Sequence, residues 1–196
     1  MREAAISIMH DHDLEEALAA LRQGGTILFP TDTNWKVGCD ACNTEAIQKI
    51  YELKNQDFSQ SFILLVDSIE MLKDYVKNLH PKLETLMVYH VRPLTIVYDR
   101  PKNLPSNAVA SDGSVAIRIP QDEYCRYLIK SFGRPLVVTS ARISKEPLPD
   151  NFSEISKTVK KKVDYIAKHR QEEHSLNDPS VIVRLSSRGE LLFLRE

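Results

Sequence analysis

Amphipathic segments and short apolar runs follow one another along the chain. In residues 12–22 apolar side chains recur every three or four positions, which predicts a helix, and Gly24 can take the left-handed conformation that ends one. The same period predicts helices at residues 44–54, 68–78, 82–90, 122–132 and 153–162. Short apolar runs predict strands at residues 26–29, 61–66, 94–98, 115–119, 136–139, 181–185 and 191–194.

This order of elements predicts one α/β domain over residues 1–196. Helices are expected to pack on a twisted open sheet that mixes parallel and antiparallel strands. The link between strands 94–98 and 115–119 has no helical pattern, so these two strands are expected to pair antiparallel. The polar stretch 170–179 is expected to be the least ordered part.

Composition narrows the class of protein. The chain carries 26 Lys and Arg against 27 Asp and Glu, so its net charge of -1 gives no general reason to bind nucleic acid, and any basic site must be local. No apolar run approaches the roughly 20 residues that span a bilayer, and the N-terminus does not resemble a signal peptide. Three cysteines argue against a disulfide framework. A cytoplasmic protein is expected.

Residues 24–42, GGTILFPTDTNWKVGCDAC, allow three interpretations. Cys39 and Cys42 form a CxxC pair ahead of a helix, whose N-terminus could lower a thiol pKa, but the pair alone is a weak signal for redox chemistry. Structural zinc needs four ligands, and no metal site is predicted. Cys125 falls within a predicted helix and is expected in the core.

The second interpretation is a phosphate or substrate loop, and the third is a simple turn. Neither GxGxxG nor GxxxxGK[ST] occurs in the chain. Pro30, Thr31, Asp32 and Thr33 nevertheless follow a buried strand, and loops at strand ends are where α/β sheets build sites. The alternative is a threonine turn that caps the sheet.

Six short motifs extend this observation along the chain. They are PTDT with an aromatic and GCDA at 30–41, IYELK at 50–54, RPLT at 92–95, VAIRIP at 115–120, GRPLVVTSA at 133–141 and PSVIV at 179–183. In this order they resemble the motifs of the YrdC-like family, the threonylcarbamoyl-AMP synthases. The resemblance runs from about Leu14 to the closing Leu194-Arg195.

The resemblance implies a fold and a reaction. The fold is the YrdC-like (YrdC/RibB-type) open α/β sheet with a basic concave surface, which also suggests binding of double-stranded RNA. The reaction takes ATP as a substrate, accompanied by Mg²⁺, together with L-threonine and bicarbonate. It yields threonylcarbamoyl-adenylate and pyrophosphate for a modification of transfer RNA. Because pyrophosphate leaves as carbamate attacks the α-phosphate, cations and hydroxyls are needed around the phosphate oxygens.

The resemblance also assigns roles to residues of this chain. The candidate catalytic residues are Lys54 and Thr33, the candidate substrate-binding residues are Thr31, Asp32 and Trp35, and the candidate nucleotide- or phosphate-binding residues are Arg118, Ser140, Arg142 and Arg195. Arg118 is a candidate site residue from the sequence pattern alone, independently of the family resemblance. A charge between apolar neighbours in a strand needs a partner or a ligand.

The chain departs from the family pattern close to the same residues. Gln56 replaces an arginine, Gln60 a lysine, Arg142 an asparagine, and Lys145 and Lys36 replace glycines. Hydrogen bonds to charged groups contribute roughly 1.5–3 kcal/mol each, so losing two such cations would slow the chemical step about 10²- to 10⁴-fold. The new cations would keep the positive potential while changing its geometry.

Three hypotheses follow. The chain is an active synthase with rearranged cations, or a degenerate relative that keeps a nucleotide or RNA ligand without the reaction. The third is a module that binds RNA through its basic surface. The lysines of residues 157–162 would contribute to that surface, and a solvated helix face is the alternative for them.

Overall fold

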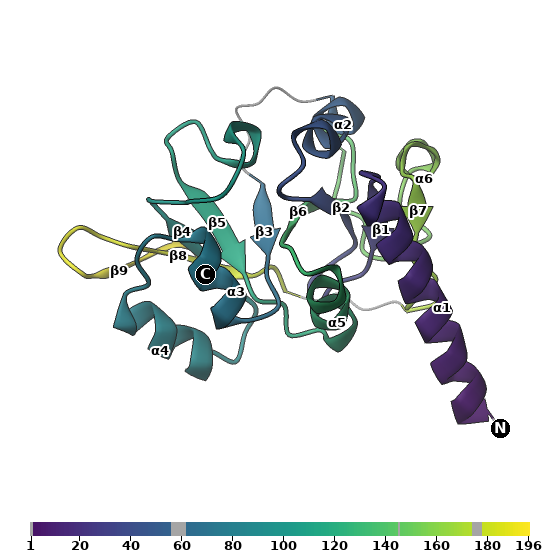
Figure 1. Cartoon of the computed structure of the whole chain (residues 1–196), viewed down its shortest axis with the longest axis horizontal. Helices are drawn as coiled ribbons and strands as arrows, with labels where there is room; N and C mark the ends of the chain where they lie inside the picture. The colour runs from purple at the N-terminus through teal and green to yellow at the C-terminus, as the bar shows by residue number, and fades with distance from the viewer. Residues whose placement is uncertain (1, 56–61, 145, 174–177) are drawn as a thin grey trace.

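The computed structural model describes residues 2–55, 62–144, 146–173 and 178–196. Within them, nine strands form one mixed sheet in the order β7-β1-β2-β6-β3-β5-β4-β8-β9 (Figure 1). The hairpin of β8 and β9 lies at one end of this sheet and α1 at the other. The predicted α/β class with a mixed sheet is confirmed.

The helices and strands have these bounds. The strands are β1 (Ile27–Phe29), β2 (Lys36–Asp40), β3 (Ile63–Leu65), β4 (Leu94–Tyr98), β5 (Val115–Arg118), β6 (Leu136–Ser140), β7 (Tyr165–Ile166), β8 (Val181–Leu185) and β9 (Leu191–Arg195). The helices are α1 (Arg2–Arg22), α2 (Thr44–Lys54), α3 (Ile69–Tyr75), α4 (Pro81–Tyr89), α5 (Glu123–Phe132) and α6 (Lys157–Lys162), with a 3₁₀ turn at Ser106–Ala108.

Most predicted elements are present, and two helices have different starting points. The predicted helix 153–162 starts only at Lys157, because the Ser156 side chain caps the first turn by accepting from the Val159 amide. The helix predicted at 12–22 begins at Arg2 instead. The predicted antiparallel pairing of β4 and β5 is confirmed. Of the stretch expected to be least ordered, residues 174–177 lie outside the described residues.

Strands β2 and β7 were not predicted. β2 carries Lys36 and Gly38 in a five-residue strand, and these two residues interrupt the apolar run that would have indicated it. β2 lies between β1 and β6 in the sheet and pairs antiparallel with both. Gly38 is required there, because a Cβ atom at this position would lie 2.9 Å from Cε1 of Phe29.

The sheet buries a hydrophobic cluster on each face. Helices α1 and α5 pack over one cluster, which includes Ile27, Phe29 and Val138. Helices α2, α3 and α4 pack over the other, which includes Leu28 and Val137. Adjacent residues of β1 and β6 thus point to opposite faces, as strand geometry requires. No helix within the described ranges is long and apolar enough to cross a membrane.

A buried carboxylate ties α1 to the C-terminal half of the chain. Asp13 is 2% exposed and accepts from the hydroxyls of Tyr165 at 2.5 Å and Tyr124 at 3.3 Å. It also accepts from the backbone amides of Lys168 at 2.7 Å and His169 at 3.1 Å. Four donors offset the cost of burying this charge, so Asp13 is a structural anchor.

The cysteines do not form a reactive pair. Cys39 is fully buried, and burial raises the pKa of its thiol. Burial likewise raises the pKa of Cys42. Both thiols therefore hold their protons, which argues against the redox interpretation of the CxxC. Cys125 lies in the core on the buried side of α5, as predicted.

Candidate functional site

A cavity of about 220 Å³ opens at the ends of three strands. Lys36 begins β2 there, Arg118 ends β5 and Ser140 ends β6. The polar residues that line the cavity are Thr33, Asn34, Lys36, Arg118, Thr139, Ser140, Arg142, Ser180 and Arg195. Four of these are cations, and no carboxylate is among the described lining residues. The cavity therefore has the electrostatic character of an anion site.

Arg118 is the most deeply buried of these cations. Its side chain is 2% exposed, forms an ion pair with Asp32, and donates from Nη1 to the Thr33 hydroxyl at 2.9 Å. Asp32 also accepts from the Gln121 backbone amide at 3.0 Å. The expectation that this charge needs a partner is confirmed. Nε of Arg118 is buried and makes no hydrogen bond to any group in the described part of the chain.

The loop before β2 is organised by Thr31. Its hydroxyl donates to the Asn34 carbonyl at 2.7 Å and accepts from the backbone amides of Thr33 at 3.2 Å and Asn34 at 3.3 Å. This is the threonine turn that was one of the interpretations of the sequence. The turn directs Thr33 into the cavity, whereas Thr31 itself does not line it. The turn and the site interpretations are therefore compatible.

Lys54 contacts the last residue of β6 and the segment that follows it. Its ammonium donates to the carbonyl oxygens of Ser140, at 3.0 Å, and of Arg142. Lys54 is 2% exposed, and burial, followed by nearby Arg142, lowers its pKa to about 8. The residue does not line the cavity, so in this structure it positions Ser140 and Arg142. Arg142 is also held by Nη1, which donates to the Glu146 carbonyl at 2.7 Å.

Arg195 reaches the cavity from β9. Its guanidinium donates to the Ser180 carbonyl at 2.9 Å and to the Ser180 hydroxyl at 3.0 Å. That hydroxyl lies 2.8 Å from the hydroxyl of Thr95 on β4. Strands β9 and β4, both distant in sequence from the loop 30–34, thereby help to fix the Arg195 guanidinium in the cavity that Thr33 and Asn34 also line.

Trp35 does not line the cationic cavity. It is 6% exposed and packs on Phe152 with ring centroids 4.8 Å apart. A second, small cavity of about 20 Å³ touches Trp35, Arg170 and Thr31, and it shares Thr33 and Asn34 with the cationic cavity. Thr33 and Asn34 are therefore the residues that connect the two cavities.

Lys36, Asn34, Thr139 and Ser180 are polar lining residues that were not among the candidate site residues, and Lys36 is the basic one among them. The sequence signal was its position, a lysine where the family has glycine. Lys36 and Arg142 do line the same cavity, as expected for new cations near the site. The other departures, Gln56, Gln60 and Lys145, lie outside the described residues. Within the described part of the chain, no group of three or more metal-ligating side chains occurs.

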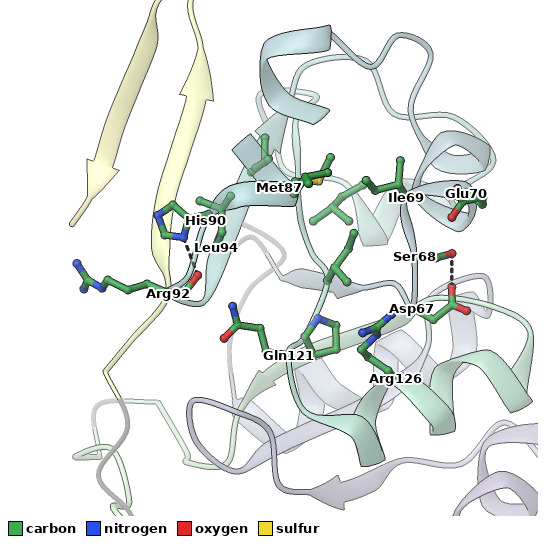
Figure 2. A pocket seen from close by; sticks show the side chains of 15 residues that line it. Asp67, Ser68, Ile69, Glu70, Met87, His90, Arg92, Leu94, Gln121 and Arg126 are labelled. Carbon is green, nitrogen blue, oxygen red and sulfur yellow. Dashed lines mark hydrogen bonds between the residues drawn. The ribbon is translucent and has the colours of Figure 1, made fainter. Parts of the chain in front are cut away.

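A larger cavity, of about 470 Å³, is shown in Figure 2. Ile117 lines it, while the next residue, Arg118, lines the cationic cavity. Figure 2 shows His90 on one side and Asp67, whose carboxylate accepts from the Ser68 hydroxyl at 2.8 Å, on the other. Its lining combines apolar side chains with both acidic and basic ones. The charged residues that line the cationic cavity, in contrast, are all basic.

Comparison with known proteins found a matching family model and similar proteins that cover most of the chain. A family model described as telomere recombination, for the Sua5, YciO and YrdC proteins, matches residues 19–196. A protein named threonylcarbamoyl-AMP synthase from Riesia pediculicola is 30% identical over 153 residues, which are 76% of this chain and 82% of that protein. One of the same name from Vibrio campbellii is 30% identical over 87% of this chain and 92% of its own length.

A solved structure is also similar. It is a crystal structure of P. abyssi Sua5 complexed with L-threonine, which superposes with a TM-score of 0.83 at 26% identity. The match covers 93% of this chain and 53% of the P. abyssi chain. The chain thus spans about half the length of that relative and most of the length of the two bacterial synthases.

Proposed function

We propose that this chain, which belongs to the Sua5/YciO/YrdC family, is a threonylcarbamoyl-AMP synthase that serves the threonylcarbamoyladenosine modification of transfer RNA. Residues 1–196 would act as one domain. L-Threonine, bicarbonate and ATP would give threonylcarbamoyl-AMP, pyrophosphate and water. The observation that carries the proposal is the cavity at the family's motifs, in which four cations and several hydroxyls face a space with no carboxylate among its described lining residues.

The first bond formed joins the threonine nitrogen to the carbon of bicarbonate, with loss of water. A carbamate oxygen then attacks the α-phosphate, and the bond to the bridging oxygen of pyrophosphate breaks. Negative charge spreads over phosphate oxygens during this step, so fixed donors accelerate it. Arg118, Arg142 and Arg195 are the guanidiniums that would hold those oxygens, and Ser140 and Thr33 the hydroxyls.

The supporting residues fix this geometry. Asp32 holds the Arg118 guanidinium in one orientation. Lys54 holds the carbonyls of Ser140 and Arg142. L-Threonine is assigned to the junction at Thr33, beside Trp35, because Thr33 and Asn34 line both cavities. The donors at the site are hydroxyls and cations, so Mg²⁺ would be bound through the oxygens of ATP instead of a carboxylate cluster.

The test is release of pyrophosphate by the purified chain with ATP, Mg²⁺, bicarbonate and L-threonine. Release that requires both threonine and bicarbonate is expected. Arg118→Met should lose this release, while Lys77→Met, an exposed lysine away from the cavity, should keep it. A folded wild-type sample that binds ATP without threonine-dependent release would identify the degenerate relative and overturn the proposal.

Binding of double-stranded RNA and a cytoplasmic location stay predictions. The lysines expected to contribute to an RNA surface are those of α6. One of them, Lys160, lies with its ammonium 4.1 Å from the centroid of the Phe152 ring. That contact gives at least this lysine a role in packing.

A further inference from the structure

Lys36 differs from the other cations of the cavity in having no partner. Arg118 is paired with Asp32, Arg195 with Ser180, and Arg142 with the Glu146 carbonyl. The Lys36 ammonium lines the same cavity and makes no hydrogen bond or ion pair with any group in the described ranges of the chain. Because a charge removed from water needs a partner, an ammonium that faces the cavity without a protein partner is available to bind a ligand there.

The groups around Lys36 are mostly positive. Arg118 at the end of β5, Arg195 on β9 and Lys54 at the end of α2 act on it as like charges. Asp32, after β1, is the opposite charge, and it is bound to Arg118. Burial of the ammonium, followed by Arg118, lowers the pKa of Lys36 to about 7. In the empty cavity near neutral pH, this lysine is therefore a mixture of amine and ammonium.

Arg142, after β6, adds a further positive charge to the lining. An anion with several negative charges reverses this balance, because an opposite charge close to an amine favours its protonated form. Lys36 would then gain a proton from solvent and a hydrogen-bond acceptor in the same event. Phosphate oxygens supply both the negative charge and the acceptors.

We propose that Lys36 is a polyphosphate-binding residue of the nucleotide site, and that it takes up a proton when the polyphosphate binds. The proposal rests on the proposed function in that ATP supplies the polyphosphate and pyrophosphate is the leaving group. When pyrophosphate departs, Lys36 returns the proton to solvent. Lys36 would thereby supply a cation to a chain whose sequence has Gln56 where its family has arginine.

The sign of the pH dependence follows. Binding raises the pKa of Lys36 above its value of about 7 in the empty cavity. Affinity for the anion is therefore greatest below that value and falls as the pH rises through the interval up to the pKa of the bound state. For one proton the fall is at most about tenfold in the dissociation constant for each pH unit.

The experiment is titration calorimetry with inorganic pyrophosphate and with ATP at about pH 8, in two buffers of different ionisation enthalpy. The wild type should take up close to one proton more than Lys36→Arg does, since protons exchanged by the ligand itself are common to both. Lys36→Met should bind roughly 10- to 100-fold more weakly, as expected for loss of a charged hydrogen bond. It should also take up correspondingly fewer protons. Lys77→Met is the matched control, with wild-type affinity and proton uptake.

Lys36→Arg keeps a positive charge in the cavity but cannot change its protonation state, since arginine stays protonated throughout the pH range. It should bind pyrophosphate while losing the proton uptake, and this result decides the question if Lys36→Met fails to fold. Equal affinity and proton uptake in the wild type and Lys36→Met, or proton uptake retained by Lys36→Arg, would overturn the role of Lys36. A wild type that binds neither pyrophosphate nor ATP would overturn the proposed function together with it. Binding and proton uptake without threonine-dependent turnover would overturn the proposed function alone.

Discussion

Asp32→Asn tests how the cavity holds its most buried cation. Asparagine keeps the size of the side chain and an oxygen that can accept from the Gln121 amide, but it removes the negative charge beside Arg118. The Arg118 guanidinium is 2% exposed, so water does not replace the lost carboxylate. The substitution should therefore lower the free energy of unfolding.

The magnitude follows from the burial of the pair. Removing one partner of a fully buried ion pair costs about 3–5 kcal/mol. Asp32 is 13% exposed, and Thr33 still accepts from Arg118 Nη1, so the expected loss is smaller, about 2–4 kcal/mol. A bound anion would restore a negative charge near Arg118. Pyrophosphate should therefore stabilise Asp32→Asn more than it stabilises the wild type.

Urea unfolding with and without pyrophosphate measures both effects. The double variant Asp32→Asn with Arg118→Met completes the cycle and isolates the coupling between the two residues. A loss below about 0.5 kcal/mol, the size typical of surface substitutions, would refute the account of a buried pair. Equal stabilisation of variant and wild type by pyrophosphate would refute the placement of the anion next to Arg118.

Three further predictions concern positions around the cavity and in the core. Between about pH 8 and pH 10, the free energy of unfolding should rise less in Lys54→Met than in the wild type. Because the pKa of Lys54 is lowered by folding, the unfolded wild type binds more protons than the folded one in this range, and its stability rises with pH. Urea unfolding of the two proteins should therefore diverge there. Asp13→Asn should lose about 2–4 kcal/mol, because an amide group would face some of the four donors, and an unchanged melting temperature would contradict the buried anchor. Gly38→Ala should lose about 1–3 kcal/mol in urea unfolding through contact with Phe29, and a stability equal to wild type would show that β2 can shift away.

Some of the site could be predicted from local pattern alone. Arg118 was recognisable as a lone charge in an apolar strand, and its partner Asp32 lies in the loop that follows another strand. Thr33 belonged to the same loop and lines the cavity. These features are visible because burial and strand ends leave signals within a few residues of the sequence.

Other features depend on contacts between distant segments. Lys54 binds carbonyls that lie 86 and 88 positions away in the sequence, and backbone atoms leave no pattern that would identify them. Asp13 binds groups more than 100 positions away. β2 was missed because its lysine and glycine serve the cavity and the packing against Phe29 instead of the apolar pattern of a strand.

Direct detection of the product is the measurement closest to the central claim. The purified chain would be incubated with ATP, Mg²⁺, L-threonine and ¹³C-labelled bicarbonate, and the adenylate identified by mass spectrometry. The account predicts threonylcarbamoyl-AMP that carries the carbon label, and its loss in Arg118→Met. Absence of the labelled adenylate from folded wild-type protein that binds ATP would contradict the claim.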